Sequence, residues 1–143
     1  MNDRQNMVSP CGVDCGSCGA HIAGNDPVML EKLLSLGLKK EDLPCKGCRA
    51  LDGRCPTVSG QCEHYICARQ HGVAFCGECK EFPCQRLHPA ADRAGTLLQN
   101  MKVFNLCLIQ RDGVDCWLAK NADIKQTYFR GKITFGKGPK LEQ

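Results

Sequence analysis

Thirteen of the 143 residues are cysteines, and six of these form three C-x-x-C pairs. The pairs are Cys15-Gly-Ser-Cys18, Cys45-Lys-Gly-Cys48 and Cys76-Gly-Glu-Cys79. Two residues between the thiols allow both sulfurs to face one tetrahedral metal centre, and a glycine in or after the pair permits the tight backbone turn that this requires. Three such pairs close together in one chain predict thiolate metal sites.

Four more cysteines lie near these pairs in the sequence. Cys11 precedes the first pair by four positions, and a C-x4-C spacing occurs at Cys62–Cys67 and again at Cys79–Cys84. Glycine-containing pairs of this kind are typical of structural zinc, so zinc is the expected metal. The sequence leaves open how many sites there are and which thiols share one. The predicted metal ligands are Cys11, Cys15, Cys18, Cys45, Cys48, Cys62, Cys67, Cys76, Cys79 and Cys84.

The apolar core available to this chain is small. Hydrophobic residues make up 43% of the chain, but this figure includes the 13 cysteines, and there is one tryptophan. A structural zinc site supplies about 10–16 kcal/mol of binding free energy, whereas a whole domain is stable by about 5–15 kcal/mol. We therefore expect metal binding to decide whether the domain folds.

The other cysteines and the histidines fit no metal-binding pattern. Cys107 and Cys116 lie beside apolar helical positions and are predicted to be small core residues, while Cys55 has no predicted role. No histidine pair has the spacing of a zinc motif, so surface or capping roles are expected for His21, His64, His71 and His88. Among these, His64 is the best substitute ligand because it lies between Cys62 and Cys67.

An iron–sulfur cluster is the alternative to zinc. The spacing Cys11-x3-Cys15-x2-Cys18 is that of radical SAM enzymes, but this strand-poor chain is too short for their large α/β barrel. A 4Fe–4S cluster held by these thiols and a fourth one, serving electron transfer or sulfur chemistry, stays open.

The sequence gives little support for an enzymatic function. Cys15-Gly-Ser-Cys18 is similar to the segment around a papain-type nucleophile, but the required histidine would lie beyond His88, the last one in the chain. A thioredoxin-like dithiol would need a βαβ unit beside its C-x-x-C, and none is visible. No catalytic residue is assigned, and Asp14 is expected to bond a neighbouring amide. A non-enzymatic binding module is therefore favoured, with a thiol oxidoreductase ranked third.

The predicted fold is mainly α, a small metal-stabilised domain with an irregular Cys-rich N-terminal part followed by helices. Asp26-Pro27 predicts a helix start and Gly37 its end, and 65–70 predicts a short helix closed by Gly72. Apolar residues at helical spacing predict a helix that stops at 112–113, and a second short helix follows it. The stripes expected to form the core are Leu97, Leu98, Met101, Phe104 and Leu108 in the first and Val114, Trp117 and Leu118 in the second.

The positive charge is confined to the end of the chain. Residues 1–119 carry 13 Lys or Arg and 13 Asp or Glu, whereas 120–143 carry six against two. We therefore predict one Cys-rich metal-binding domain over 8–122 and a basic flexible tail over 123–143. Aromatic residues in this tail could stack on single-stranded nucleic acid, but a solvated end is the preferred interpretation. The expected partners are thus a metal ion and an unidentified protein, without nucleic acid or membrane.

The N-terminal residues indicate the compartment. Residues 1–6 are polar and charged, without the apolar run of a secretory leader, and no stretch is apolar enough to cross a membrane. A cytoplasmic location is therefore expected, where thiols stay reduced and bind metal rather than form disulfides.

The order of these motifs resembles a known family. The segments Pro10-Cys11-Gly12-Val13-Asp14-Cys15, Cys45-Lys-Gly-Cys48-Arg49 and Phe82-Pro83-Cys84 are similar to those of small cysteine-rich prokaryotic proteins of unknown function. The resemblance covers about residues 8–119 and implies a zinc-binding cytoplasmic protein without an established reaction. The chain differs from the family pattern at Cys107, at Cys116 and at Ser59, where members often have a cysteine, which leaves the ligand set around residues 62 and 67 open.

Overall fold

The computed structural model describes residues 1–142, and its secondary structure is mostly helical. The α-helices in this range are α1 (Asp3–Asn6), α2 (Gly19–Ile22), α3 (Pro27–Ser35), α4 (Glu63–Gln70), α5 (Lys102–Asp112) and α6 (Val114–Arg130). Short 3-10 turns are η1 (Cys15–Ser17), η2 (Lys40–Asp42), η3 (Cys76–Glu78), η4 (Gln85–Leu87) and η5 (Gln99–Met101). The mainly α fold class is thus confirmed.

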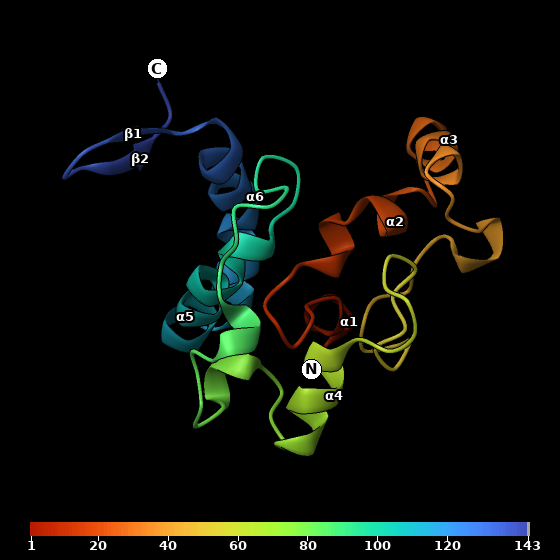
Figure 1. Cartoon of the computed structure of the whole chain (residues 1–143), viewed down its shortest axis with the longest axis horizontal. Coiled ribbons are helices and arrows are strands. Elements are labelled where there is room, and N and C mark those ends of the chain that lie inside the picture. Colours follow the sequence, from red (N-terminus) through yellow and green to blue (C-terminus); the bar gives the residue numbers. More distant parts are fainter. Residues whose placement is uncertain (143) are drawn as a thin grey trace.

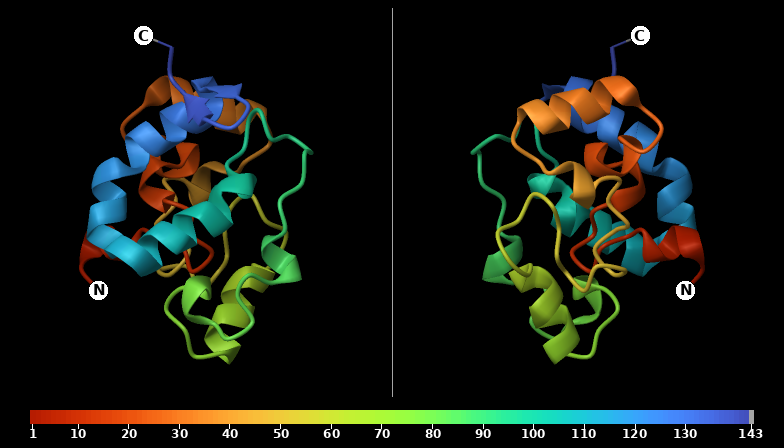
Figure 2. Two further views of the ribbon diagram at one scale, coloured as in Figure 1. Left: turned by 90° about the vertical axis from the view of Figure 1, so that its left-hand side faces the viewer. Right: turned by 90° about the vertical axis from the view of Figure 1, so that its right-hand side faces the viewer.

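The arrangement places two helical groups around irregular segments. Figure 1 shows α5, α6 and the C-terminal hairpin along one side, α2 and α3 on the opposite side, and loops between them. The turned views of Figure 2 show α4 projecting at one end of the molecule, away from the hairpin. The hairpin consists of β1 (Lys132–Thr134) and β2 (Gly138–Lys140), antiparallel with Ile133 opposite Pro139.

Local sequence signals set the boundaries of α3 and the end of α4 as predicted, while α4 begins at Glu63, two residues before the predicted start. The Asp26 carboxylate caps α3 by accepting from the amide of Met29 at 3.0 Å, and Pro27 occupies the first turn. The chain leaves α3 at Gly37 and α4 at Gly72, both with positive φ.

The two long helices differ from the prediction in extent and in which side they bury. α5 begins only at Lys102, and its buried residues are Asn105, Leu106 and Ile109, not the predicted stripe. Phe104 is 53% exposed because it lies about 150° around the helix from the centre of this buried side. Of the predicted stripe, Leu108 packs partly buried against the core, whereas the assignment of Leu97 and Phe104 to the core is wrong. α6 is correctly placed by Trp117 and Leu118, but it is a long helix of 17 residues.

The prediction that Cys107 and Cys116 are core residues is wrong, because both are exposed. Each lies about 150° around its helix from the centre of the buried side, by the same geometry as Phe104. Neither thiol therefore contributes to the core.

The core joins the helices to the Cys-rich segments. Indole Nε1 of Trp117 donates to Oδ1 of Asn105 at 3.3 Å, and Nδ2 of Asn105 donates to the carbonyl of Gly12 at 2.9 Å. Gly12 has φ +83°, and a β-carbon there would lie 3.0 Å from Cγ of Leu106. This buried network fixes the loop that follows Cys11. The buried core residues are Val8, Cys11, Phe75, Leu87, Leu106, Ile109, Trp117 and Leu118.

The basic segment begins inside a helix. The predicted boundary at residue 122 falls within α6, and 132–140 form the hairpin. The division into a domain and a tail stays a prediction. None of the helices in residues 1–142 combines the length and hydropathy that a bilayer-spanning segment requires.

Candidate metal centre

Two of the C-x-x-C pairs have the same backbone shape. In η1 the amide of Cys18 donates to the carbonyl of Cys15, and in η3 the amide of Cys79 donates to the carbonyl of Cys76, each at 3.1 Å. The Asp14 carboxylate caps η1 by accepting from the Gly16 amide at 2.9 Å, the role expected for it. These tight turns bring the two thiol-bearing residues of a pair close together in space.

A glycine shapes the remaining pair, Cys45–Cys48. Gly47 has φ +91°, which an L-residue with a side chain rarely adopts. Its amide donates to Sγ of Cys45 at 3.4 Å. An amide donor directed at sulfur stabilises the thiolate form, which is the form that binds metal.

The pairs Cys15–Cys18 and Cys45–Cys48 lie together in one cluster. A β-carbon placed at Gly47 would lie 3.8 Å from Cβ of Cys15, and the amide of Cys45 donates to the carbonyl of Ala20 at 2.8 Å. Burial raises the pKa of the Cys15 thiol to about 12, and charge on the nearby thiols of Cys11, Cys18 and Cys45 adds to the shift. We call Cys11, Cys15, Cys18, Cys45 and Cys48 the first thiol set.

The second cluster surrounds a small hollow. Four cysteines, together with His71, line a cavity of about 30 Å³. Burial raises the pKa of the Cys76 thiol to about 12, and nearby Cys11 and Cys67 raise it further. We call the four cysteines, Cys67, Cys76, Cys79 and Cys84, the second thiol set.

Cys62 belongs to neither set by its contacts. It precedes α4, with Sγ 3.9 Å from Nδ1 of His64. The interaction with His64 lowers the pKa of this thiol to about 7. The amide of Cys62 donates to the carbonyl of Gly53 at 2.9 Å, the amide of Gly53 donates to the carbonyl of Cys48 at 2.8 Å, and charge on Cys62 raises the pKa of Cys48, so the structure places Cys62 nearer to the first set.

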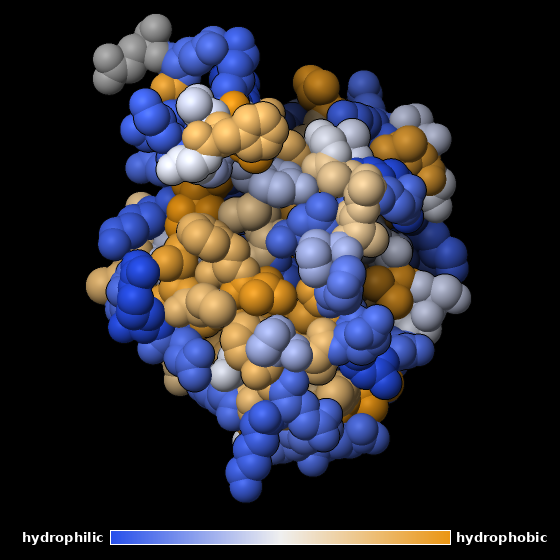
Figure 3. Space-filling model, turned by 60° about the vertical axis from the view of Figure 1, so that its left-hand side comes forward, coloured by the Kyte–Doolittle hydropathy of each residue, from blue (hydrophilic) through white to orange (hydrophobic). Residues whose placement is uncertain are grey.

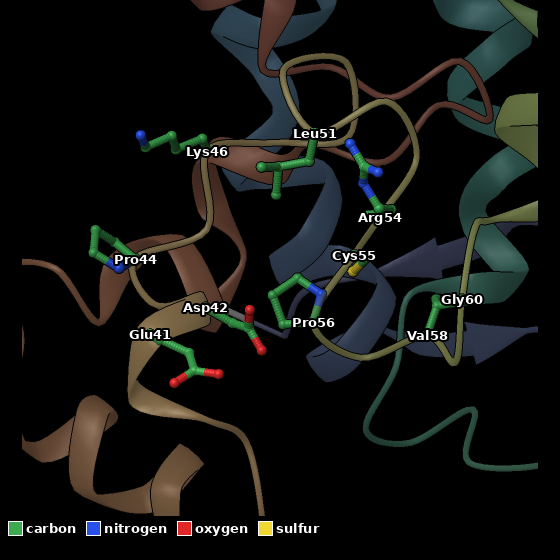
Figure 4. Close-up of a pocket in the computed structure, with 10 residues that line it drawn as sticks. All are labelled: Glu41, Asp42, Pro44, Lys46, Leu51, Arg54, Cys55, Pro56, Val58 and Gly60. Atoms are coloured by element: carbon green, nitrogen blue, oxygen red, sulfur yellow. The ribbon is translucent and has the colours of Figure 1, made fainter.

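The sequence did not assign a role to Cys55, which the structure places at the edge of the first set. Charge on this thiol raises the pKa of Cys45, although burial of Cys45 is the larger cause. Because Cys55 has no C-x-x-C partner, local spacing carries no signal for it. It also lines a polar pocket of about 530 Å³, where Glu41 and Asp42 lie on one side and Arg54 on the other (Figure 4).

Arg49 ties the two thiol sets together. It follows Cys48, and its Nε donates to the carbonyl of Val8 at 2.8 Å while a terminal nitrogen donates to the carbonyl of Ala74 at 2.6 Å. The guanidinium also lies 5.0 Å from the centre of the Phe75 ring. Burial lowers the pKa of this guanidinium, and the nearby Cys48 thiol acts in the opposite direction. One side chain thus connects the segments before Cys11, after Cys48 and before Cys76.

The histidines are bound to backbone carbonyls, in agreement with the surface or capping role. His21 contacts the carbonyl of Cys45 at 2.8 Å and His71 that of Cys67 at 2.9 Å. His64 contacts the carbonyl of Arg86 at 2.9 Å. His88 contacts the carbonyl of Pro89 at 2.7 Å.

The thiols of each set lie near one another, but they are not arranged around a single metal position. Across residues 1–142, no three His, Cys, Asp or Glu side chains are already placed where they could hold one metal ion. All thirteen cysteines are free thiols. The donor chemistry of each set nevertheless fits a thiophilic cation, since each offers at least four sulfurs within one cluster. The ligand assignment and the metal stay predictions.

Comparison with known proteins identifies a family whose function is unknown. A family model described as "Protein of unknown function (DUF3795)" matches residues 7–89. This range contains both thiol sets and excludes α5 and α6. No curated protein and no solved structure matches the chain.

Proposed function

The chain belongs to the family described as protein of unknown function (DUF3795), and from its own residues we propose that it is a zinc-binding interaction module. In this proposal each thiol set holds one zinc ion, and the metal is structural rather than catalytic. The observation that carries it is the close approach of Gly47 to Cys15, where a β-carbon on the glycine would lie 3.8 Å from Cβ of the cysteine. This approach brings together two C-x-x-C pairs from segments far apart in the sequence, and two such pairs supply the four sulfurs of a structural zinc site.

The raised pKa values of the buried thiols favour binding of a divalent cation. Burial and neighbouring thiols raise the pKa of Cys15, Cys48 and Cys76 to about 12. Several thiolates cannot coexist at this spacing without a positive charge among them. Zinc supplies that charge and displaces the thiol protons, so binding releases protons.

We also propose that the chain works in a reducing compartment such as the cytoplasm. Thirteen free thiols would be vulnerable to disulfide exchange in an oxidising one. Thiolate coordination of zinc requires reduced cysteines, which is consistent with this location.

A 4Fe–4S cluster is the second candidate, and the position of Cys11 favours it. Cys11 is buried, and charge on it raises the pKa of both Cys15 and Cys76. It therefore lies where it can complete a cluster with Cys15 and Cys18 and a fourth thiolate. Such a protein would be brown and would lose its visible absorbance on reduction.

Metal content distinguishes these candidates. Protein purified without oxygen is analysed for zinc, iron and sulfide, as wild type and as the variants Cys15→Ser, Cys76→Ser and Cys107→Ser. We expect about two zinc ions per chain in the wild type and about one in each of the first two variants. The exposed Cys107 provides the matched control, and Cys107→Ser should keep both ions.

Three results would overturn the proposal. One is a metal-free wild type that still unfolds cooperatively. Another is iron with acid-labile sulfide in place of zinc. The third is loss of metal from Cys107→Ser equal to that from Cys15→Ser.

A further inference from the structure

Two polar residues of α6 lie on the side of this helix that faces the core. Helical spacing places Asn121 and Lys125 on the same side as Val114, Trp117 and Leu118, which pack in the core. Asn121 is buried, and Lys125 is half-buried. The core-facing side of α6 therefore changes from apolar to polar along the helix. A lysine at such a position loses part of its hydration, so its charge needs a partner.

Both residues contact the turn that carries the pair Cys15–Cys18. Nδ2 of Asn121 donates to Oδ2 of Asp14 at 2.8 Å, while the other oxygen of this carboxylate caps η1. Nζ of Lys125 donates to the hydroxyl of Ser17 at 3.1 Å. Because Asp14 precedes η1 and Ser17 is its last residue, α6 holds this turn at both ends.

The ammonium group of Lys125 has no carboxylate partner within residues 1–142. It lies instead beside a thiol pair whose zinc complex would be anionic. A zinc ion bound by four thiolates leaves two negative charges in excess, and the Asp14 carboxylate adds another beside it. Positive groups close to such a centre stabilise it. Arg49 is already near the Cys48 thiol, so Lys125 provides a second cation at the first thiol set.

Another side of α6 has a different environment. Ile124, Thr127 and Tyr128 line an apolar hollow, and Figure 3 shows the broad apolar area on this side of the molecule. Lys120 also belongs to that lining, and its Nζ lies 3.8 Å from Oδ2 of Asp112. One helix thus offers a lysine beside the thiols and a lysine away from them.

We propose that Lys125 raises the affinity of the first thiol set for zinc by offsetting the negative charge of the metal–thiolate centre, while Asn121 keeps the turn in place. The inference rests on the proposed function, since it needs zinc in the first set. The hydrogen bonds of α6 side chains in residues 1–142 do not reach the second set, so its affinity should be independent of Lys125. Both residues also lie outside the range 7–89 that matches the family.

Competition with a zinc chelator of known affinity measures how tightly the full chain holds each ion. Lys125→Met removes the charge but keeps the length of the side chain, and Lys125→Arg keeps the charge. Lys120→Met is the matched control on the same helix. Each substitution is also made in Cys76→Ser, where only the first set is intact, and in Cys15→Ser, where only the second set is. Far-UV circular dichroism is recorded for every variant.

The expected loss is confined to one ion. Lys125→Met should weaken the binding of one of the two zinc ions by about 10–100-fold, as substitutions next to metal ligands do, and Lys125→Arg should retain most of the affinity. The loss should appear in the Cys76→Ser background and be absent from the Cys15→Ser background. Lys120→Met should leave the affinity for both ions unchanged.

The inference is overturned if Lys125→Met holds both ions as tightly as the wild type or weakens both equally, because the charge then does not act on the first set. It is also overturned if Lys125→Arg binds zinc no better than Lys125→Met, or if Lys120→Met causes the same loss. In each of these cases a wild type with two zinc ions leaves the zinc proposal intact. A folded wild type that binds no zinc overturns both.

Discussion

Replacing Arg49 should destabilise the protein more than any other single change to an arginine in the Cys-rich segment. The hydrogen bond from Nε to the carbonyl of Val8 is part-buried, and Val8 itself is fully buried. Losing a charged donor to such a carbonyl costs about 1.5–3 kcal/mol. The exposed bond to the carbonyl of Ala74 adds about 0.5 kcal/mol, and the contact with the Phe75 ring about 0.5–1 kcal/mol. Arg49→Met should therefore lower the free energy of unfolding by about 3 kcal/mol.

The assay is urea unfolding of the holo-protein, followed by circular dichroism. Arg49→Lys keeps the charge but reaches one carbonyl at most, so about half of the loss is expected. Arg54→Met is the matched control, because Arg54 lies in the same loop region, is exposed, and its side chain makes no hydrogen bond or ion pair with another residue of 1–142. If Arg49→Met stays within about 0.5 kcal/mol of the wild type, or matches Arg54→Met, the bridging role of Arg49 is refuted.

Three further outcomes follow from the same contacts. Cys107 and Cys116 are exposed, so iodoacetamide should label them before any thiol of either set in holo-protein, as peptide mapping would reveal; faster labelling of a thiol in either set would contradict this. Gly12→Ala should lower the free energy of unfolding by about 1–3 kcal/mol, because φ is +83° and Leu106 is 3.0 Å from the new carbon; an unchanged urea midpoint would contradict it. Zinc added to reduced, metal-free protein at pH 7 should release protons, because the thiols of Cys15, Cys48 and Cys76, whose pKa is raised to about 12, are protonated at that pH and bind the metal as thiolates. An unchanged pH in weakly buffered solution when zinc is added would contradict this.

Local chemistry made part of this architecture predictable. The cap at Asp26, the proline after it and the glycine at 37 act within a few residues, so the boundaries of α3 follow from the sequence. The tight turns of the C-x-x-C pairs likewise depend on the short spacing of the cysteines and on glycine. Both kinds of signal are contained in windows shorter than ten residues.

Contacts between distant segments could not be predicted in this way. Local spacing does not say that Gly47 lies against Cys15, nor that Arg49 reaches residues 8 and 74. The side of α5 that is buried depends on the Cys-rich segment packed against it, so Phe104 was assigned to the core although it is 53% exposed.

Zinc X-ray absorption on protein purified without oxygen tests most directly whether thiols from separate segments share a metal ion. We predict a zinc edge whose fine structure fits four sulfur neighbours at about 2.3 Å for both sites. A shell dominated by nitrogen or oxygen at about 2.0 Å, or the absence of zinc from folded protein, would contradict the proposal.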